Sequence, residues 1–213
     1  MQIAIDGPAA SGKGTLAKTL AMKFGFDYLD TGTLYRAVAR DALAQSVDLQ
    51  DPEGQVDTLC QIAYDLALPL ENTDGLRAAD VAQAASKVAS LSKVRDALIA
   101  KQRSFAASPP SGQGAVLDGR DIGTVILPEA DIKFYIDADI TVRARRRHLE
   151  LSVHDDNLTL AEVLADLTER DARDKNRATA PLIPADDAIF IDTSEKNAEE
   201  VLQLVASLVE ERR

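Results

Sequence analysis

One short glycine-rich stretch near the start of the chain limits what the rest can fold into. Residues 7–13 read Gly-Pro-Ala-Ala-Ser-Gly-Lys, the spacing G-x-x-x-x-G-K, between an apolar segment at residues 2–5 and an amphipathic one at residues 12–24. Glycine has no Cβ, so backbone N–H groups can converge on phosphate oxygens, and a helix that starts there adds the positive end of its dipole. We therefore expect a strand, a phosphate-binding loop and a helix, with Lys13 reaching the β- and γ-phosphates of a nucleotide.

The residue after the lysine departs from the usual form of this loop, in which a serine or threonine hydroxyl binds Mg²⁺. Here Gly14 follows Lys13, and Thr15 comes next. Two interpretations remain open: the Thr15 hydroxyl faces the ion, or the loop has a variant geometry. The nucleotide-binding residues that we predict are Gly7, Pro8, Ala9, Ala10, Ser11, Gly12, Lys13, Gly14 and Thr15.

Apolar segments alternate with amphipathic ones along the chain, which is typical of βαβ units around a parallel sheet with helices on both faces. We therefore predict an α/β fold, and 213 residues suit one domain with a sizeable core. We expect strands at residues 2–5, 115–117, 132–136 and 188–191. The expected helices span residues 12–24, 33–44, 51–66, 79–106 with an interruption near residues 91–92, 141–151, 160–174 and 197–211.

The formal net charge of −11 argues against nucleic acid or an anionic membrane surface as the main partner, although local arginine clusters suit an anionic small molecule. The one cysteine, Cys60, excludes an internal disulfide, and we expect it to be buried. The sequence has neither an apolar run long enough for a membrane span nor the pattern of a secretory signal, so we expect a cytoplasmic protein. His148 and His154 lack the spacing of metal ligands, and we assign them no role.

Two groups of three arginines have helical spacing: Arg143, Arg146 and Arg147 in one predicted helix, and Arg170, Arg173 and Arg177 in the next. Like charges at this spacing repel unless an anion or a carboxylate joins them. For the first group, the alternative to an anion site is a solvated face. For the second, in which two aspartates are interleaved, the alternative is a helix held by salt bridges.

Four further blocks resemble, in the same order, those of bacterial cytidylate kinases, a branch of the nucleoside monophosphate kinases, whose loop tolerates glycine after the lysine. They are residues 29–39 (LDTGTLYRAVA), 81–98 (VAQAASKVASLSKVRDAL), 117–138 (LDGRDIGTVILPEADIKFYIDA) and 169–194 (ERDARDKNRATAPLIPADDAIFIDTS). The resemblance implies one P-loop NTPase-like domain with a small acceptor-binding insert and a short lid. It places the core at residues 1–44 and 108–213, the insert at residues 45–107 and the lid at residues 143–177.

The same resemblance implies in-line transfer of the γ-phosphoryl group of ATP, with Mg²⁺, to the phosphate of CMP or dCMP. It implies a monomer whose partners are these small molecules, with no nucleic acid or membrane partner. The residues implied for CMP are Thr31, Tyr35, Arg36, Ser86, Arg95, Arg120, Asp121, Arg170, Asp174 and Arg177. Those implied for the transfer are Lys13, Arg120, Arg143, Arg146 and Arg173, and those implied for Mg²⁺, through water, are Thr15 and Asp118.

Two other classes share the phosphate-binding loop. A GTP-binding switch needs an Asn-Lys-x-Asp motif, which the sequence lacks, and a small-metabolite kinase such as shikimate kinase does not need the set Ser86, Arg95 and Asp121 for a pyrimidine. One departure from the family is the segment at residues 64–81, which is shorter than we expect. It leaves open how the acceptor region closes and whether ribose or deoxyribose is preferred.

Overall fold

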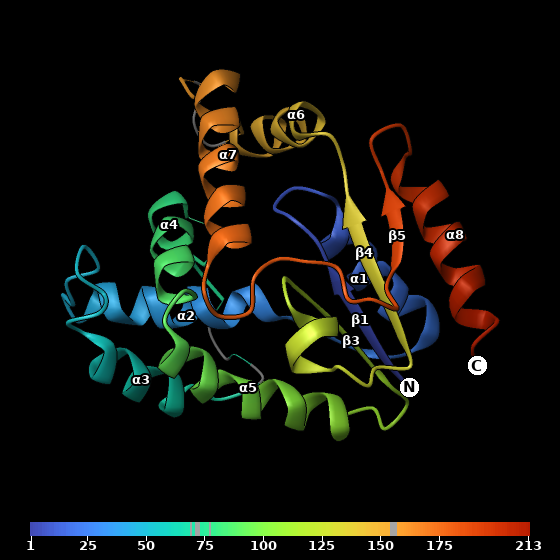
Figure 1. Ribbon diagram of the computed structural model, residues 1–213, viewed down its shortest axis with the longest axis horizontal. Helices are drawn as coiled ribbons and strands as arrows, with labels where there is room; N and C mark the ends of the chain where they lie inside the picture. Colours follow the sequence, from blue (N-terminus) through green and yellow to red (C-terminus); the bar gives the residue numbers. More distant parts are fainter. Residues whose placement is uncertain (69, 71–72, 77, 154–156) are drawn as a thin grey trace. The chain divides into compact units, whose positions relative to one another are not determined.

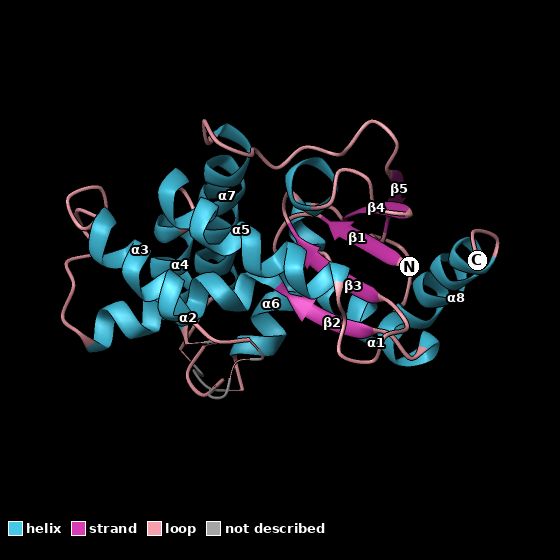
Figure 2. Ribbon diagram, turned by 90° about the horizontal axis from the view of Figure 1, so that it is seen from below, coloured by secondary structure: helices cyan, strands magenta, loops and turns pink. Residues whose placement is uncertain are grey.

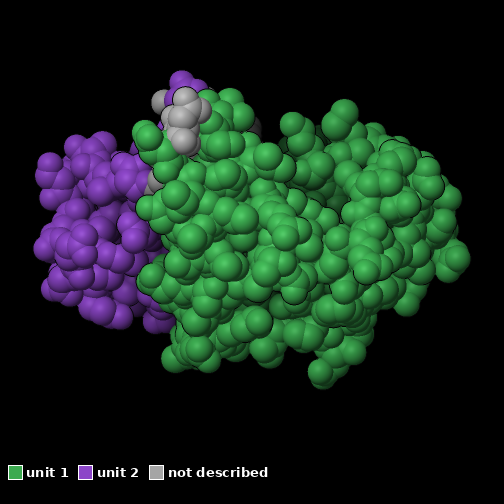
Figure 3. Space-filling model, turned by 90° about the horizontal axis from the view of Figure 1, so that it is seen from above, with its two compact units in different colours: residues 1–29, 109–213 green, residues 30–108 purple. Residues whose placement is uncertain are grey.

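The computed structural model describes residues 1–68, 70, 73–76, 78–153 and 157–213 (Figure 1). The chain divides into two compact units, which Figure 3 shows in different colours. Unit 1 consists of Met1–Leu29 and Pro109–Arg213, and unit 2 consists of Asp30–Ser108.

Unit 1 is built on a five-stranded sheet with the strand order β2-β3-β1-β4-β5 (Figure 2). Its strands are β1 (Gln2–Asp6), β2 (Asp27–Asp30), β3 (Ala115–Gly119), β4 (Ile132–Asp137) and β5 (Ile189–Asp192). β1 pairs in parallel with both β3 and β4, and β4 pairs in parallel with β5. The carboxyl ends of these four strands therefore meet at one edge of the sheet, where ligands bind in folds of this class.

The helical segments among the described residues of unit 1 are α1 (Lys13–Phe24), the π-helix η1 (Ile122–Ile126), α6 (Ile140–Leu151), α7 (Leu160–Asn176) and α8 (Ala198–Glu210). The main core lies where α1 and α8 pack on β1 and β4. Its fully buried side chains include Ile3, Ile5, Leu20, Ile136 and Val205. α1 ends at Gly25, whose φ of 68° is left-handed, and the N–H of Phe26 turns back to the carbonyl of Ala21.

Unit 2 is helical and contains α2 (Thr31–Ala44), α3 (Val56–Asp65), α4 (Ala79–Val88) and α5 (Ser92–Ala107). α2 packs on α3 and α4, and α3 packs on α5. Buried side chains of this unit include Leu34, Val38, Leu59, Val88 and Leu98. The expected interruption near residues 91–92 is confirmed, because α4 ends at Val88 and α5 begins at Ser92.

The predicted α/β fold is confirmed, with differences in β2, η1 and α3 and in the exposure of Cys60. β2 and η1 were not predicted, because DYLD is half polar and IGTVI is too short to show a period. α3 begins at Val56 and not at residue 51, because Asp51 accepts the Gly54 N–H in a turn (3.2 Å). Cys60 is partly exposed, so the expectation of a buried thiol was wrong.

The boundary of unit 2 also differs from that of the predicted insert, which starts at residue 45. Unit 2 starts at Asp30 because the buried face of α2, with Leu34 and Val38, packs on other helices of that unit. The division into core, insert and lid by binding role stays a prediction. In the segment at residues 64–81, residues 69, 71–72 and 77 lie outside the described part, and those that are described form no strand. Across the described residues, no helix combines the length and the apolar character needed to cross a membrane.

Candidate active site at the carboxyl edge of the sheet

The phosphate-binding loop leaves β1 through a glycine that no other residue can replace without a shift. Gly7 has a φ of 153°, and a Cβ there would lie 2.0 Å from the carbonyl oxygen of Ile136 in β4. Gly12, with a φ of 89°, precedes α1, and no side chain of the described residues caps that helix end. The first N–H groups of α1 therefore face the loop and suit an anion. This arrangement matches the prediction from the glycine spacing.

Lys13 lies between the loop and the end of β3. Its Nζ donates to the carbonyl of Pro8 (3.4 Å) and lies 4.0 Å from Oδ2 of Asp118. The Tyr28 hydroxyl donates to Oδ1 of the same carboxylate (2.7 Å), a contact that the sequence did not indicate. A Cβ on Gly14 would lie 3.7 Å from both the Asp118 carboxylate and the Tyr28 hydroxyl. The position after the lysine therefore faces the predicted Mg²⁺ residue, while Thr15 is exposed on the first turn of α1.

Two arginines are paired with carboxylates: Arg120 directly after β3 and Arg177 directly after α7. Nε of Arg120 donates to Oδ2 of Asp174 (2.9 Å), and Nη2 of Arg177 lies 3.5 Å from Oδ1 of Asp121. Burial acts to raise the pKa of Asp174, but the charges of Arg120, Arg170 and Arg177 outweigh it and hold that pKa below its ordinary value. The structure thus brings together five residues that the sequence predicted for the acceptor.

The three arginines of α6 contact different groups of the protein, and their predicted role beside the transferring phosphate stays a prediction. Arg143 is buried and donates to the carbonyls of Ala138 (2.9 Å) and Ala9 (3.2 Å) and to Oδ2 of Asp171 (2.6 Å). Arg146 donates to the hydroxyl (3.0 Å) and the carbonyl (2.7 Å) of Thr193. Arg147 pairs with Glu150 (2.8 Å). Each guanidinium binds a different group of the protein, and Arg143 holds the loop, α6 and α7 together.

On α7, the salt-bridge interpretation holds for Arg173, which pairs with the exposed Glu169 (2.6 Å). Arg170 is partly buried and acts on the pKa of Asp174 from the same helix. His148 places Nε2 2.8 Å from the carbonyl of Leu158, and His154 lies outside the described residues. The three arginines therefore do not act as one group: Arg173 pairs with Glu169 at the surface, whereas Arg170 and Arg177 lie near Asp174.

The remaining predicted acceptor residues belong to unit 2. Thr31, Tyr35, Ser86 and Arg95 are buried there, and Arg95 is only 1% exposed. The Arg95 guanidinium lies 5.7 Å from the centre of the Tyr35 ring, a cation–π contact. Nη2 of Arg36 donates to Oδ2 of Asp30 at the start of α2 (2.6 Å).

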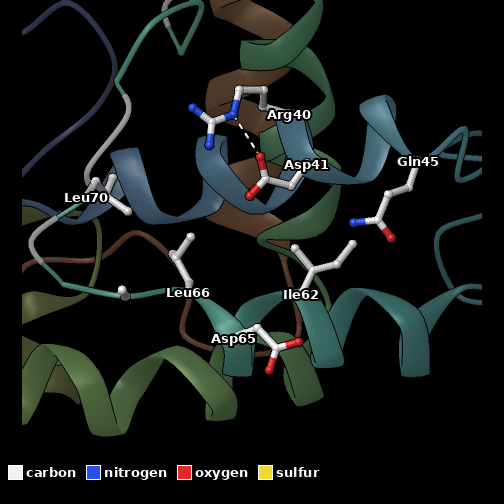
Figure 4. Close-up of a pocket in the computed structure, with 8 residues that line it drawn as sticks. Arg40, Asp41, Gln45, Ile62, Asp65, Leu66 and Leu70 are labelled. Atoms are coloured by element: carbon white, nitrogen blue, oxygen red, sulfur yellow. Dashed lines mark hydrogen bonds and ion pairs between the residues drawn. The ribbon is translucent and has the colours of Figure 1, made fainter.

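A separate pocket of about 360 Å³ opens within unit 2 between α2 and the end of α3 (Figure 4). Its lining includes the adjacent pair Arg40 and Asp41, Ile62 and Leu66, and none of the predicted acceptor residues. We assign this pocket no part in the site.

The geometry predicts that Arg143 stabilises the fold through buried contacts. We expect Arg143→Ala to lower the free energy of unfolding by about 3–5 kcal/mol, because it leaves the buried Asp171 carboxylate without its cation. Arg173→Ala removes an exposed pair and should cost only about 0–1 kcal/mol. Urea denaturation of both variants measures the difference, and equal stability of the two would contradict the assignment.

Comparisons with known proteins identify the family of the chain. The family described as cytidylate kinase matches residues 3–211. The cytidylate kinase of Paramagnetospirillum magneticum is 50% identical over 211 residues, which cover 99% of this chain and 98% of that protein. The cytidylate kinase of Methylocella silvestris is 50% identical over 210 residues, covering 99% of this chain and 94% of that protein.

The fold is also similar to solved structures at low sequence identity. An uncharacterized protein from Eubacterium ventriosum matches with a TM-score of 0.56 at 14% identity, covering 99% of this chain and 98% of that one. A protein from Chloroflexus aurantiacus matches with a TM-score of 0.50, also at 14% identity, covering 100% and 97%. These two structures show the fold alone, whereas the sequence matches extend over nearly the whole chain. The chain therefore belongs to the cytidylate kinase family.

Proposed function

We propose that this protein transfers the γ-phosphoryl group of ATP to the phosphate of CMP or dCMP and releases ADP with CDP or dCDP. The observation that carries the proposal is the set of buried ion pairs Arg120–Asp174 and Arg177–Asp121, in the same unit as the phosphate-binding loop. We further propose that it works as a cytoplasmic monomer with these small molecules as its partners.

The loop from Gly7 to Thr15 binds the ATP phosphates through its backbone N–H groups, and Lys13 offsets negative charge on the β- and γ-phosphates. The acceptor oxygen of CMP is already ionised, so the transfer needs no general base. Catalysis then consists of positioning two anions in line and of neutralising their charge. Arginines in place of a catalytic histidine suit this task.

Mg²⁺ fits the residues present. Among the described residues, no group of three or more His, Cys, Asp or Glu side chains could hold a metal by itself. The Asp118 carboxylate and the exposed Thr15 hydroxyl offer the few protein ligands that Mg²⁺ takes when it also binds phosphates and water. Bound there, the ion would neutralise phosphate charge; Tyr28 fixes the rotamer of Asp118 through its 2.7 Å hydrogen bond.

We assign acceptor-binding roles within each unit separately. In unit 1, Arg120, Arg170 and Arg177 contact its phosphate, Asp174 holds the sugar hydroxyls and Asp121 accepts from the N4 amine of cytosine. From unit 2 we assign the phosphate to Arg36, the base to Ser86 and Arg95, and the pocket wall to Thr31 and Tyr35. Arg146 and Arg173 assist the transferring phosphate.

A coupled assay of ADP release with CMP, dCMP, UMP, AMP and shikimate as acceptors tests the proposed function. We expect CMP and dCMP to be the preferred acceptors, because only cytosine presents an amine to Asp121 among the pyrimidines. Lys13→Ala should remove most of kcat in a folded protein, and this variant controls for contaminating kinases. Preference for AMP or shikimate, or most of kcat retained without Lys13, would contradict the proposal.

Asp121 should determine the choice between cytosine and uracil. A carboxylate accepts from the N4 amine of cytosine and repels the O4 carbonyl of uracil. An unpaired buried polar group costs about 1–3 kcal/mol, or roughly 5–150-fold in affinity. We therefore expect Asp121→Asn and Asp121→Ala to lower kcat/KM for CMP and to narrow the CMP-to-UMP ratio. A fall in CMP activity at an unchanged ratio would mean that another group reads the base.

A further inference from the structure

Asp6, the last residue of β1, is buried and directly precedes the phosphate-binding loop. It is 4% exposed, and each of its carboxylate oxygens accepts a backbone N–H. Oδ1 accepts from Ile122 and Oδ2 from Gly123, both at 2.8 Å. These donors are the first two residues of η1, more than a hundred residues away in the sequence.

The contact fixes the turn that carries two proposed acceptor residues. η1 begins directly after Asp121, whose own carbonyl accepts from Val125 (2.9 Å) and Ile126 (3.1 Å). The backbone from Asp121 to Gly123, directly after Arg120, is therefore held on one side by the η1 hydrogen bonds and on the other by the Asp6 carboxylate. A rotation of this turn would move both Arg120 and Asp121.

The close approach of the Asp6 carboxylate to the start of η1 depends on glycine at position 123. A Cβ there would lie 3.1 Å from Cδ of Lys133 and 3.4 Å from Oδ2 of Asp6. The Lys133 ammonium is directed to Asp187 (2.8 Å), so its stem and not its charge lies against the turn. A larger residue would press on both the Lys133 stem and the carboxylate, so we expect it to shift η1 relative to Asp6.

We propose that Asp6 is a positioning residue, which fixes the Arg120–Asp121 turn through two backbone hydrogen bonds and thereby sets the affinity for the acceptor nucleotide. The inference rests on the proposed assignment of Arg120 and Asp121 to the acceptor. Because Gly7 follows Asp6, one strand end serves both the donor loop and the acceptor turn.

If Asp6 positions this turn, the affinity for the acceptor nucleotide should depend on the protonation state of Asp6 and therefore on pH. Burial raises the pKa of Asp6 to about 7, against the lowering effect of its two backbone donors. The neighbouring Asp121 raises it further and Arg120 lowers it, while Tyr135 of β4, itself with a pKa raised to about 12, stays neutral. Only the carboxylate accepts both N–H groups fully, so acceptor affinity should fall as the pH falls through about 7.

The free energy of unfolding should change with pH in the direction opposite to that of acceptor affinity. The folded protein binds the Asp6 proton more tightly than the unfolded chain, whose carboxyl has a pKa near 3.8. Between these values, the contribution of Asp6 to the free energy of unfolding decreases as the pH rises. A positioning role for Asp6 therefore predicts that acceptor affinity rises with pH, whereas a purely structural role predicts only a free energy of unfolding that falls with pH.

The test compares the wild type with Asp6→Asn, which keeps the shape but offers only one acceptor oxygen. Asp187→Asn is the matched control, because it makes the same chemical change on an exposed partner of Lys133. KM for CMP, KM for ATP and kcat are measured between about pH 5.5 and about pH 9, with urea unfolding in parallel. The phosphate ionisations of CMP and ATP are common to all variants, so the ratio of wild type to variant isolates Asp6.

We expect Asp6→Asn to raise KM for CMP about tenfold above pH 7, with KM for ATP changed by less than about twofold. The wild-type to Asp6→Asn ratio of kcat/KM for CMP should rise with pH through about 7, and Asp187→Asn should behave as the wild type. Unchanged kinetics of folded Asp6→Asn would overturn the proposal, as would equal losses for both nucleotides.

If Asp6→Asn does not fold, Gly123→Ala tests the same contact with the carboxylate retained. It should raise KM for CMP and leave KM for ATP unchanged, and an unchanged KM for CMP would overturn the proposal. A wild type that does not phosphorylate CMP at all would instead contradict the proposed function and, with it, this inference. The two failures are therefore distinguishable in one data set.

Discussion

Buried pairing of carboxylates with guanidinium groups is the constraint on which unit 1 depends. Arg120 with Asp174, Arg177 with Asp121 and Arg143 with Asp171 lie largely out of water. A charge removed from water needs a partner of opposite sign, because desolvation otherwise exceeds what the fold can compensate. An acidic chain of net charge −11 can thus hold arginines at the edge of its sheet in fixed positions. A phosphate that binds there meets guanidinium groups that are already oriented, at little further cost in side-chain entropy.

The end of β1 connects this array to the nucleotide loop. Gly7 lets the chain pass against the carbonyl of Ile136, and Asp6, one residue earlier, holds the turn of Arg120 and Asp121. Arg143 adds a third link, because it contacts the loop at Ala9 and α7 at Asp171. The donor loop, the acceptor turn and α7 are therefore tied to one another by buried polar contacts.

Most strands and helices could be predicted from the sequence. The elements and contacts that could not be predicted are those that leave no period in the sequence or that join distant residues. Apolar runs and helical periods predicted four strands and most helices, since burial on one face leaves a period in the sequence. β2 was not predicted, because an edge strand with two aspartates in four residues shows no hydrophobic period. η1 was not predicted, because five residues are too few to show a helical period. Spacing placed Arg143 on a helix face but could not show its partners, which are distant in sequence. Asp6 could have been found, because it ends an apolar strand as Asp118 does.

The central claim is that the arginines at this edge bind the acceptor nucleotide and not the donor. Isothermal titration of CMP and of ATP to the wild type and to Arg177→Ala tests it most directly, with Arg145→Ala, an exposed arginine of α6, as the matched control. We predict that Arg177→Ala weakens CMP about tenfold or more, since charge-assisted contacts to phosphate are lost, while ATP affinity changes by less than about twofold. Equal losses for CMP and ATP, or a loss as large for Arg145→Ala, would contradict the account.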